Sequence, residues 1–197
     1  MGGSSGGTVY WRGVRLDART AAAMDAAAAM CPGIIVRPTQ GSWSGAAASA
    51  GTHAGSSAID LAAGALTAAQ RAQLVRAMRC CGFAAWLRTP AQSDWPFHVH
   101  GILMADPPAA HGAAPAAQSQ MRQYLNGTNG LANMAPDDGP RDFPGGPGIL
   151  WEQHRPTDDE GTDDMPATFF QHKGHRYIAY TGAGVAEVAA GCANLRA

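Results

Sequence analysis

The carboxylate most in need of a partner in this sequence is that of Asp60. It is the only acidic residue between positions 26 and 93, and its neighbours on both sides are apolar. A carboxylate in apolar surroundings is costly unless a cation compensates it, and a metal ion or an arginine can do so. His53 precedes Asp60 by seven residues and supplies an imidazole, which binds transition metals. The segment predicts either a metal site or an ion pair of Asp60 with Arg37 or Arg88.

A second source of metal ligands is the H-x-H pair formed by His98 and His100. On a strand, residues i and i+2 project from the same face, although single histidines on strands more often serve in cores or on surfaces. Two histidines and one aspartate make a ligand set that suits zinc, and three protein ligands leave one position open for water. Such water loses a proton near neutral pH and becomes a nucleophile, while a histidine that does not bind the metal can shuttle protons.

Short strands and helices must position these residues. Brief apolar runs predict strands over residues 8–16, 34–36, 58–61, 83–88 and 95–104. N-cap signals at Asp17 and Thr67 favour helices, which are expected over residues 18–30, 67–81 and 116–125. The segment 38–57 is rich in Gly, Ser, Ala and Thr and predicts a loop or an irregular hairpin. Few, short strands among helices indicate an α+β fold with a small antiparallel sheet and flanking helices.

The chain is expected to have three parts. Residues 1–7 form a Gly/Ser tail, residues 8–150 form the domain with the candidate site, and residues 151–197 form an appendage. The appendage contains an acidic run at 158–164, interpreted as a solvated loop, and aromatic residues at 169–180 that predict a β-hairpin. A two-stranded hairpin is not stable alone in water, so it must dock on the domain or on a partner.

Composition and charge exclude several classes of function. The 197 residues include only 15% charged residues and carry a formal net charge of -1, which argues against a nucleic-acid partner. No apolar run approaches 18 residues, so no membrane span is expected. The opening MGGSSGG has neither the basic nor the apolar region of a secretory signal peptide. The four cysteines lack a C-x-x-C pair and are predicted to be buried free thiols.

The histidine and aspartate motif resembles that of the M15 family of zinc D,D-peptidases, which includes D-Ala-D-Ala carboxypeptidases and phage endolysins. The first signature of that family is S-x-H-x-x-G-x-A-x-D, and residues 51–60 of this chain read GTHAGSSAID. The His, Ala and Asp of the signature match in place. Gly51 and Ser56 stand where the signature has Ser and Gly.

The second signature of the family ends in a histidine that binds zinc. One branch of the family has a Glu three residues before this histidine, and another branch has a His two residues before it. In this chain Phe97 takes the position of the Glu, and His98 fits the H-x-H branch that ends at His100.

The resemblance extends loosely over residues 10–145 and leaves the C-terminal part unmatched. It implies a fold like that of the hedgehog and D,D-peptidase domains, with Zn²⁺ as the cofactor. The site residues that it implies are His53, Asp60 and His100 as zinc ligands, His98 as the catalytic residue and Gln40 as a substrate contact.

The function expected from this resemblance is zinc-dependent hydrolysis of peptide bonds in bacterial peptidoglycan. The enzyme would be a D,D-carboxypeptidase or an endolysin-type endopeptidase that uses zinc-bound water as the nucleophile. The alternative is a phage virion-associated structural or wall-docking protein that keeps the peptidase fold with weak or no activity, and that contacts virion proteins through residues 151–197. Without a signal peptide, the chain would leave the host cytoplasm by holin-type release or travel on a phage particle, and would act at the cell wall.

Overall fold

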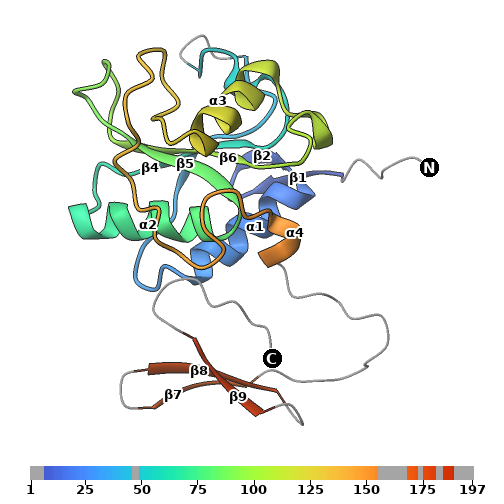
Figure 1. The fold of residues 1–197 in the computed structure, drawn as a ribbon, viewed down its shortest axis with the longest axis vertical. Coiled ribbons are helices and arrows are strands. Elements are labelled where there is room, and N and C mark those ends of the chain that lie inside the picture. The colour runs from blue at the N-terminus through green and yellow to red at the C-terminus, as the bar shows by residue number, and fades with distance from the viewer. Residues whose placement is uncertain (1–6, 46–48, 155–167, 173–174, 181–183, 189–197) are drawn as a thin grey trace.

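The computed structural model describes residues 7–45, 49–154, 168–172, 175–180 and 184–188, the last three as backbone strands only. It has a mixed α+β architecture in which a small antiparallel sheet lies between helices (Figure 1). This confirms the predicted fold class. Of the regions expected at the ends of the domain, residues 1–6 and the acidic run at 158–164 lie outside the described residues.

The central sheet has four strands in the order β3-β4-β6-β5, and all neighbouring pairs are antiparallel. Their bounds are Pro38–Gln40 for β3, Ala58–Ala62 for β4, His98–Leu103 for β6 and Phe83–Arg88 for β5. The strands predicted at 58–61 and 83–88 are confirmed. The strand predicted at 95–104 begins only at His98, after a proline that has no N–H to donate to a ladder.

The strand predicted over residues 34–36 is wrong. Those residues lie outside any strand, and Ile35 is 84% exposed, so only Val36 of the apolar run faces the core. The edge strand β3 begins two residues later, inside the segment that was predicted to be a loop or an irregular hairpin, and it pairs antiparallel with β4 in an irregular register. An apolar run of three residues carries too little periodicity to distinguish a buried strand from a surface turn.

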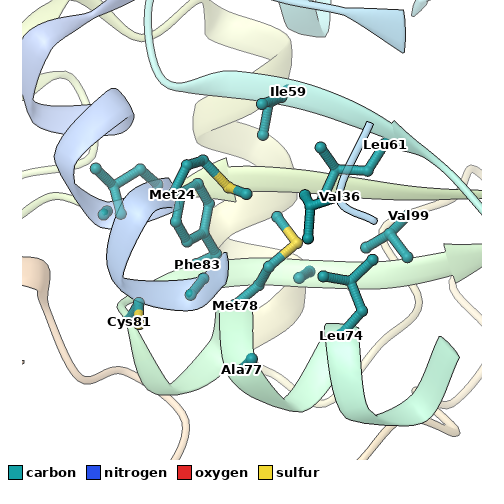
Figure 2. Close-up of a cluster of buried hydrophobic side chains, with 14 of the residues drawn as sticks. Met24, Val36, Ile59, Leu61, Leu74, Ala77, Met78, Cys81, Phe83 and Val99 are labelled. Atoms are coloured by element: carbon teal, nitrogen blue, oxygen red, sulfur yellow. The ribbon is translucent and has the colours of Figure 1, made fainter. Parts of the chain in front are cut away.

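Two helices cover one face of the sheet and a third covers the other (Figure 1). Helix α1 (Ala18–Ala29) and helix α2 (Ala68–Cys80) pack on the first face, where Figure 2 shows their side chains meeting those of the strands. Met24 of α1 and Met78 of α2 meet Phe83 there, all fully buried. Helix α3 (Pro115–Leu125), predicted at 116–125, packs on the second face.

Strand alternation places the candidate ligands on the second face. Ile59, Leu61 and Val99 point into the core shared with α1 and α2 (Figure 2). Asp60 and His100 alternate with these apolar residues and therefore project toward the side of α3. The sheet thus separates an apolar face, which stabilises the domain, from a face that carries polar groups.

The chain enters the domain through a hairpin of β1 (Thr8–Trp11) and β2 (Val14–Asp17), which ends at the N-cap of α1. Asp17 accepts hydrogen bonds from the backbone N–H of Thr20 at 2.8 Å and from the backbone N–H of Ser57 at 3.1 Å. Ser57 lies between His53 and Asp60 in the sequence. The Asp17 carboxylate therefore ties the start of α1 to the segment that carries two of the candidate ligands.

The C-terminal end of the domain is held by helix α4 (Trp151–His154). Trp151 belongs to the main core cluster, and Glu152 accepts a hydrogen bond from Arg19 of α1 at 2.9 Å. Beyond it, β7 (Thr168–His172) and β8 (His175–Tyr180) form the predicted hairpin. A third strand, β9 (Gly184–Val188), extends this hairpin to a three-stranded antiparallel sheet.

The cysteines differ in their state. Cys31 and Cys81 are buried free thiols, as predicted, and burial raises the pKa of Cys31 to about 11. Cys80 is disulfide-bonded, so the prediction of a free thiol is wrong at that position. Consecutive residues at the end of α2 point in different directions, and Cys80 lies in a small cluster separate from the main core. In the described part of the chain, no helix has the length and apolar character needed to cross a membrane.

We predict that Asp17→Ala lowers the free energy of unfolding by about 2–4 kcal/mol, because it removes a helix cap and leaves the buried N–H of Ser57 unsatisfied. Thr67→Ala, which removes the exposed capping box of α2, is the control and should cost about 1 kcal/mol. Urea denaturation of both variants measures the difference. Equal losses in the two variants would contradict the role given to Asp17.

Candidate metal centre

Three elements bring His53, Asp60 and His100 together. His53 lies in the 3₁₀ turn η2 (Thr52–Ala54), and Asp60 on β4 faces His100 on β6 in the strand register. One potential ligand atom from each of the three residues lies within 4.8 Å of the other two. The sequence prediction of this trio is therefore confirmed as a spatial cluster that can hold a metal ion.

His53 presents an unsatisfied nitrogen to the cluster. Its side chain is fully buried, and its Nδ1 lies 2.9 Å from the backbone carbonyl of Gly41. Because a carbonyl can only accept, Nδ1 carries a proton, and in the neutral form of the ring Nε2 would carry the lone pair. This Nε2 has no hydrogen-bond partner among the described residues and lies 3.3 Å from Oδ2 of Asp60. A metal ion bound between the lone pair on Nε2 and the carboxylate oxygen would satisfy both atoms.

Asp60 directs its two carboxylate oxygens at the two histidines. Oδ2 faces His53, and Oδ1 lies 2.7 Å from Nδ1 of His100. Burial alone would raise the pKa of Asp60, but the two neighbouring imidazoles outweigh it and lower that pKa well below its ordinary value. The carboxylate is therefore ionised at neutral pH. The alternative ion pair does not form, because within the described part of the chain Asp60 pairs with the histidines and not with Arg37 or Arg88.

His100 is held from three directions. Asp60 contacts Nδ1, the side-chain oxygen of Gln120 lies 2.9 Å from Nε2, and the Trp86 ring stacks on the imidazole at 6.2 Å between centroids and 14° between planes. Burial lowers the pKa of His100 and outweighs the opposing effect of Asp60. The ring is therefore neutral at pH 7, which is the form that binds a metal ion.

His98, the predicted catalytic residue, lies beside the cluster. It is the first residue of β6, two residues before His100 and on the same face of the strand. Its Nδ1 lies 2.9 Å from the carbonyl of Pro96, and its ring packs edge-on against Trp95. Among the described residues it makes no hydrogen bond or ring contact with the three clustered side chains. The structure therefore does not include it in the ligand set.

Gln40, the predicted substrate contact, lies directly next to a candidate ligand. It occupies the edge strand β3 opposite Asp60 in the register, and its side-chain amide donates a hydrogen bond to Ser44 at 3.0 Å. Ser44 in turn bonds through its backbone to the carbonyl of His53. Gln40 thus borders the cluster on the side of the sheet edge.

The two departures from the M15-like signature have simple local explanations. Gly51 adopts a φ of +80°, a conformation that favours glycine over the serine of the signature. Ser56 stands where the signature has glycine, but its φ is not positive, and its hydroxyl donates to the carbonyl of His111. The left-handed residue of this turn is Ser57, with φ of +76°.

Sequence reasoning identified neither Gln120 nor Trp86 as a contact of His100. Both contact His100 from elements that are distant in the sequence. The one sequence signal was the position of Gln120 on α3, three residues after buried Ala117 and four before buried Tyr124. A polar side chain within the apolar stripe of a helix calls for a polar partner on the surface it covers.

Comparison of the chain with models of protein families, with curated proteins and with solved structures found no match.

We predict that the metal-free chain gains stability from zinc but not from magnesium, because two imidazoles and one carboxylate favour zinc. Zinc at 100 times its Kd should add about 2.7 kcal/mol to the free energy of unfolding. Metal-dependent shifts in Tm, with and without a chelator, measure this effect. The shift should diminish as the pH falls from 7 to 5, because protons compete with the metal for the imidazoles.

His53→Ala should abolish the zinc-dependent shift. The control is His111→Asn, which changes an exposed histidine with φ of +62° to a residue that tolerates this conformation. The site would be refuted if His53→Ala kept the full zinc response, or if the unaltered chain had none.

Proposed function

We propose that this chain is a zinc-dependent peptidase that hydrolyses peptide bonds of bacterial peptidoglycan. The observation that carries the proposal is the buried, unpartnered Nε2 of His53 facing the ionised carboxylate of Asp60. A metal ion would satisfy both atoms at once. The neutral ring of His100 completes a set of three ligands of the kind found in catalytic zinc sites.

Zinc in this site would supply Lewis-acid chemistry, polarising a carbonyl and lowering the pKa of water. The protein supplies rigid positioning. The carbonyl of Gly41 fixes the ring of His53, and the stacked Trp86 fixes the plane of His100. Both histidines are deeply buried, so their orientation is set before a substrate arrives.

We assign proton transfer to His98. A backbone carbonyl can only accept, so the contact of Nδ1 with Pro96 places the proton of the neutral ring on Nδ1. Nε2 is then available as a base. Its place on the same strand face as His100 puts it beside the metal ligands, and its partial exposure leaves room for a substrate to reach it.

The substrate class rests on the M15-like motifs. The spacing of His53 and Asp60, together with the H-x-H pair ending at His100, is similar to the signatures of zinc D,D-peptidases. A ligand set drawn from one turn and two antiparallel strands is consistent with the hedgehog and D,D-peptidase type of fold that those motifs imply. Gln40, next to Asp60 at the sheet edge, is proposed to contact the peptide.

A second function is favoured by Phe97, which replaces the Glu of one branch of the M15 family. Its ring packs under the guanidinium of Arg71 at 3.8 Å and belongs to the apolar side of the sheet. The position therefore supplies no acid or base. A wall-docking or virion protein that keeps the fold with weak activity would match this loss, with residues 151–197 contacting virion partners. Either function places the protein at the cell wall, reached by holin-type release or on a phage particle.

We predict that the zinc-loaded chain releases free D-Ala or cleaved cross-links from purified sacculi, detected by mass spectrometry. His98→Gln should retain zinc and reduce turnover by about 10²–10⁴-fold, because it removes the base. His100→Ala should lose both zinc and turnover, while His111→Asn should lose neither.

A zinc-loaded chain that yields no product, but sediments with sacculi, would replace the peptidase proposal with the wall-docking function. Full turnover in His98→Gln would refute the role given to that residue while leaving the peptidase intact.

A further inference from the structure

The two histidines of the cluster point opposite nitrogens at Asp60. His53 uses Nε2 at 3.3 Å from Oδ2, and His100 uses Nδ1 at 2.7 Å from Oδ1. In each ring the nitrogen on the far side meets an oxygen of the protein. For His53 this oxygen is the carbonyl of Gly41, and for His100 it is the side-chain oxygen of Gln120 at 2.9 Å.

The position of Gln120 is set by the packing of α3. This helix packs against β5 and β6, with Ala117, Met121 and Tyr124 buried in the cluster that covers the second face of the sheet. Gln120 lies in the same stripe of the helix and is half-buried. Its side chain reaches the ring of His100 from the side opposite Asp60.

A neutral imidazole has one proton, and its location decides which nitrogen can bind a metal ion. Both nitrogens of His100 face an acceptor, Oδ1 of Asp60 at Nδ1 and the amide oxygen of Gln120 at Nε2. With a metal ion bound at Asp60, the acceptor at Nε2 would hold the proton there and leave the lone pair on Nδ1 for the metal. The ring of Trp86, which is stacked on the imidazole of His100, restricts rotation of that imidazole. The arrangement at His100 thus parallels that at His53 with the two nitrogens exchanged. The carbonyl of Gly41 faces Nδ1 of His53, and the side-chain oxygen of Gln120 faces Nε2 of His100.

We propose that Gln120 is a positioning residue that holds the proton of His100 on Nε2, so that Nδ1 is the metal-binding atom. The inference rests on the proposed metal chemistry but concerns a residue of α3 outside both motifs. Partners of this kind beyond the ligands typically change metal affinity by about 10- to 100-fold when they are removed. The amide oxygen also raises the electron density of the ring that would donate to the metal.

The test is a zinc titration of the full chain by competition with a chromophoric chelator at pH 7. Gln120→Leu removes the acceptor at similar size and should weaken zinc binding by about 10- to 100-fold. Gln120→Glu can only accept, so it should bind zinc at least as tightly as the unaltered chain. Gln123→Leu changes a glutamine of the same helix that does not touch His100 and should leave the affinity unchanged.

A second readout is the ¹⁵N NMR spectrum of the His100 ring in the zinc-loaded chain. The inference expects a proton on Nε2 and the metal on Nδ1, and it expects Gln120→Glu to keep this pattern. Chelator-treated samples of each variant, compared by Tm, separate a loss of folding from a loss of affinity.

Equal zinc affinity in Gln120→Leu and the unaltered chain would overturn the inference and leave the proposed function standing. Zinc on Nε2 of His100 would overturn it as well. A zinc-loaded chain that does not act on peptidoglycan would contradict the proposed function, whereas the affinity difference between Gln120→Leu and Gln120→Glu would still support the inference.

Discussion

The arrangement of this domain depends on one buried carboxylate placed between two imidazoles. Asp60 would be costly in the middle of a sheet if its charge were not compensated, and the chain compensates it with histidines from a turn and from the neighbouring strand. The compensation is incomplete, because Nε2 of His53 has no hydrogen bond among the described residues. A buried cluster of two imidazoles and one carboxylate of this kind can hold a metal ion.

Much of the surrounding fold serves to hold the rings around that carboxylate. The segment that carries His53 and Asp60 is tied to the first helix through Asp17, and the loop after β3 places the carbonyl of Gly41 behind His53. On the other side, α3 brings Gln120 to His100. Because these contacts come from separate elements, the ring orientations depend on the assembled domain. Rigid ligands lose little entropy on binding, which favours a preorganised metal centre.

The parts of the fold that were predicted from sequence are those governed by local chemistry. The N-caps at Asp17 and Thr67 and the strand around Asp60 follow from neighbouring residues and appear as expected. The strand expected over residues 34–36 failed because the burial of an apolar run depends on what covers it, and there Ile35 faces solvent. The edge strand β3 exists because it pairs with β4, although its own sequence resembles a loop.

The sequence by itself offered His53, Asp60 and the H-x-H pair as candidate ligands, with an ion pair of Asp60 to Arg37 or Arg88 as the alternative, and the resemblance to the M15 signatures implied the set of three. The sequence also determined that His98 and His100 share a strand face, since alternation is a property of the extended backbone. Only the tertiary structure decided which nitrogen of each ring faces Asp60, and that Gln120 and Trp86 hold His100. Ring orientation depends on acceptors that approach through space from distant segments, and no local pattern encodes that approach.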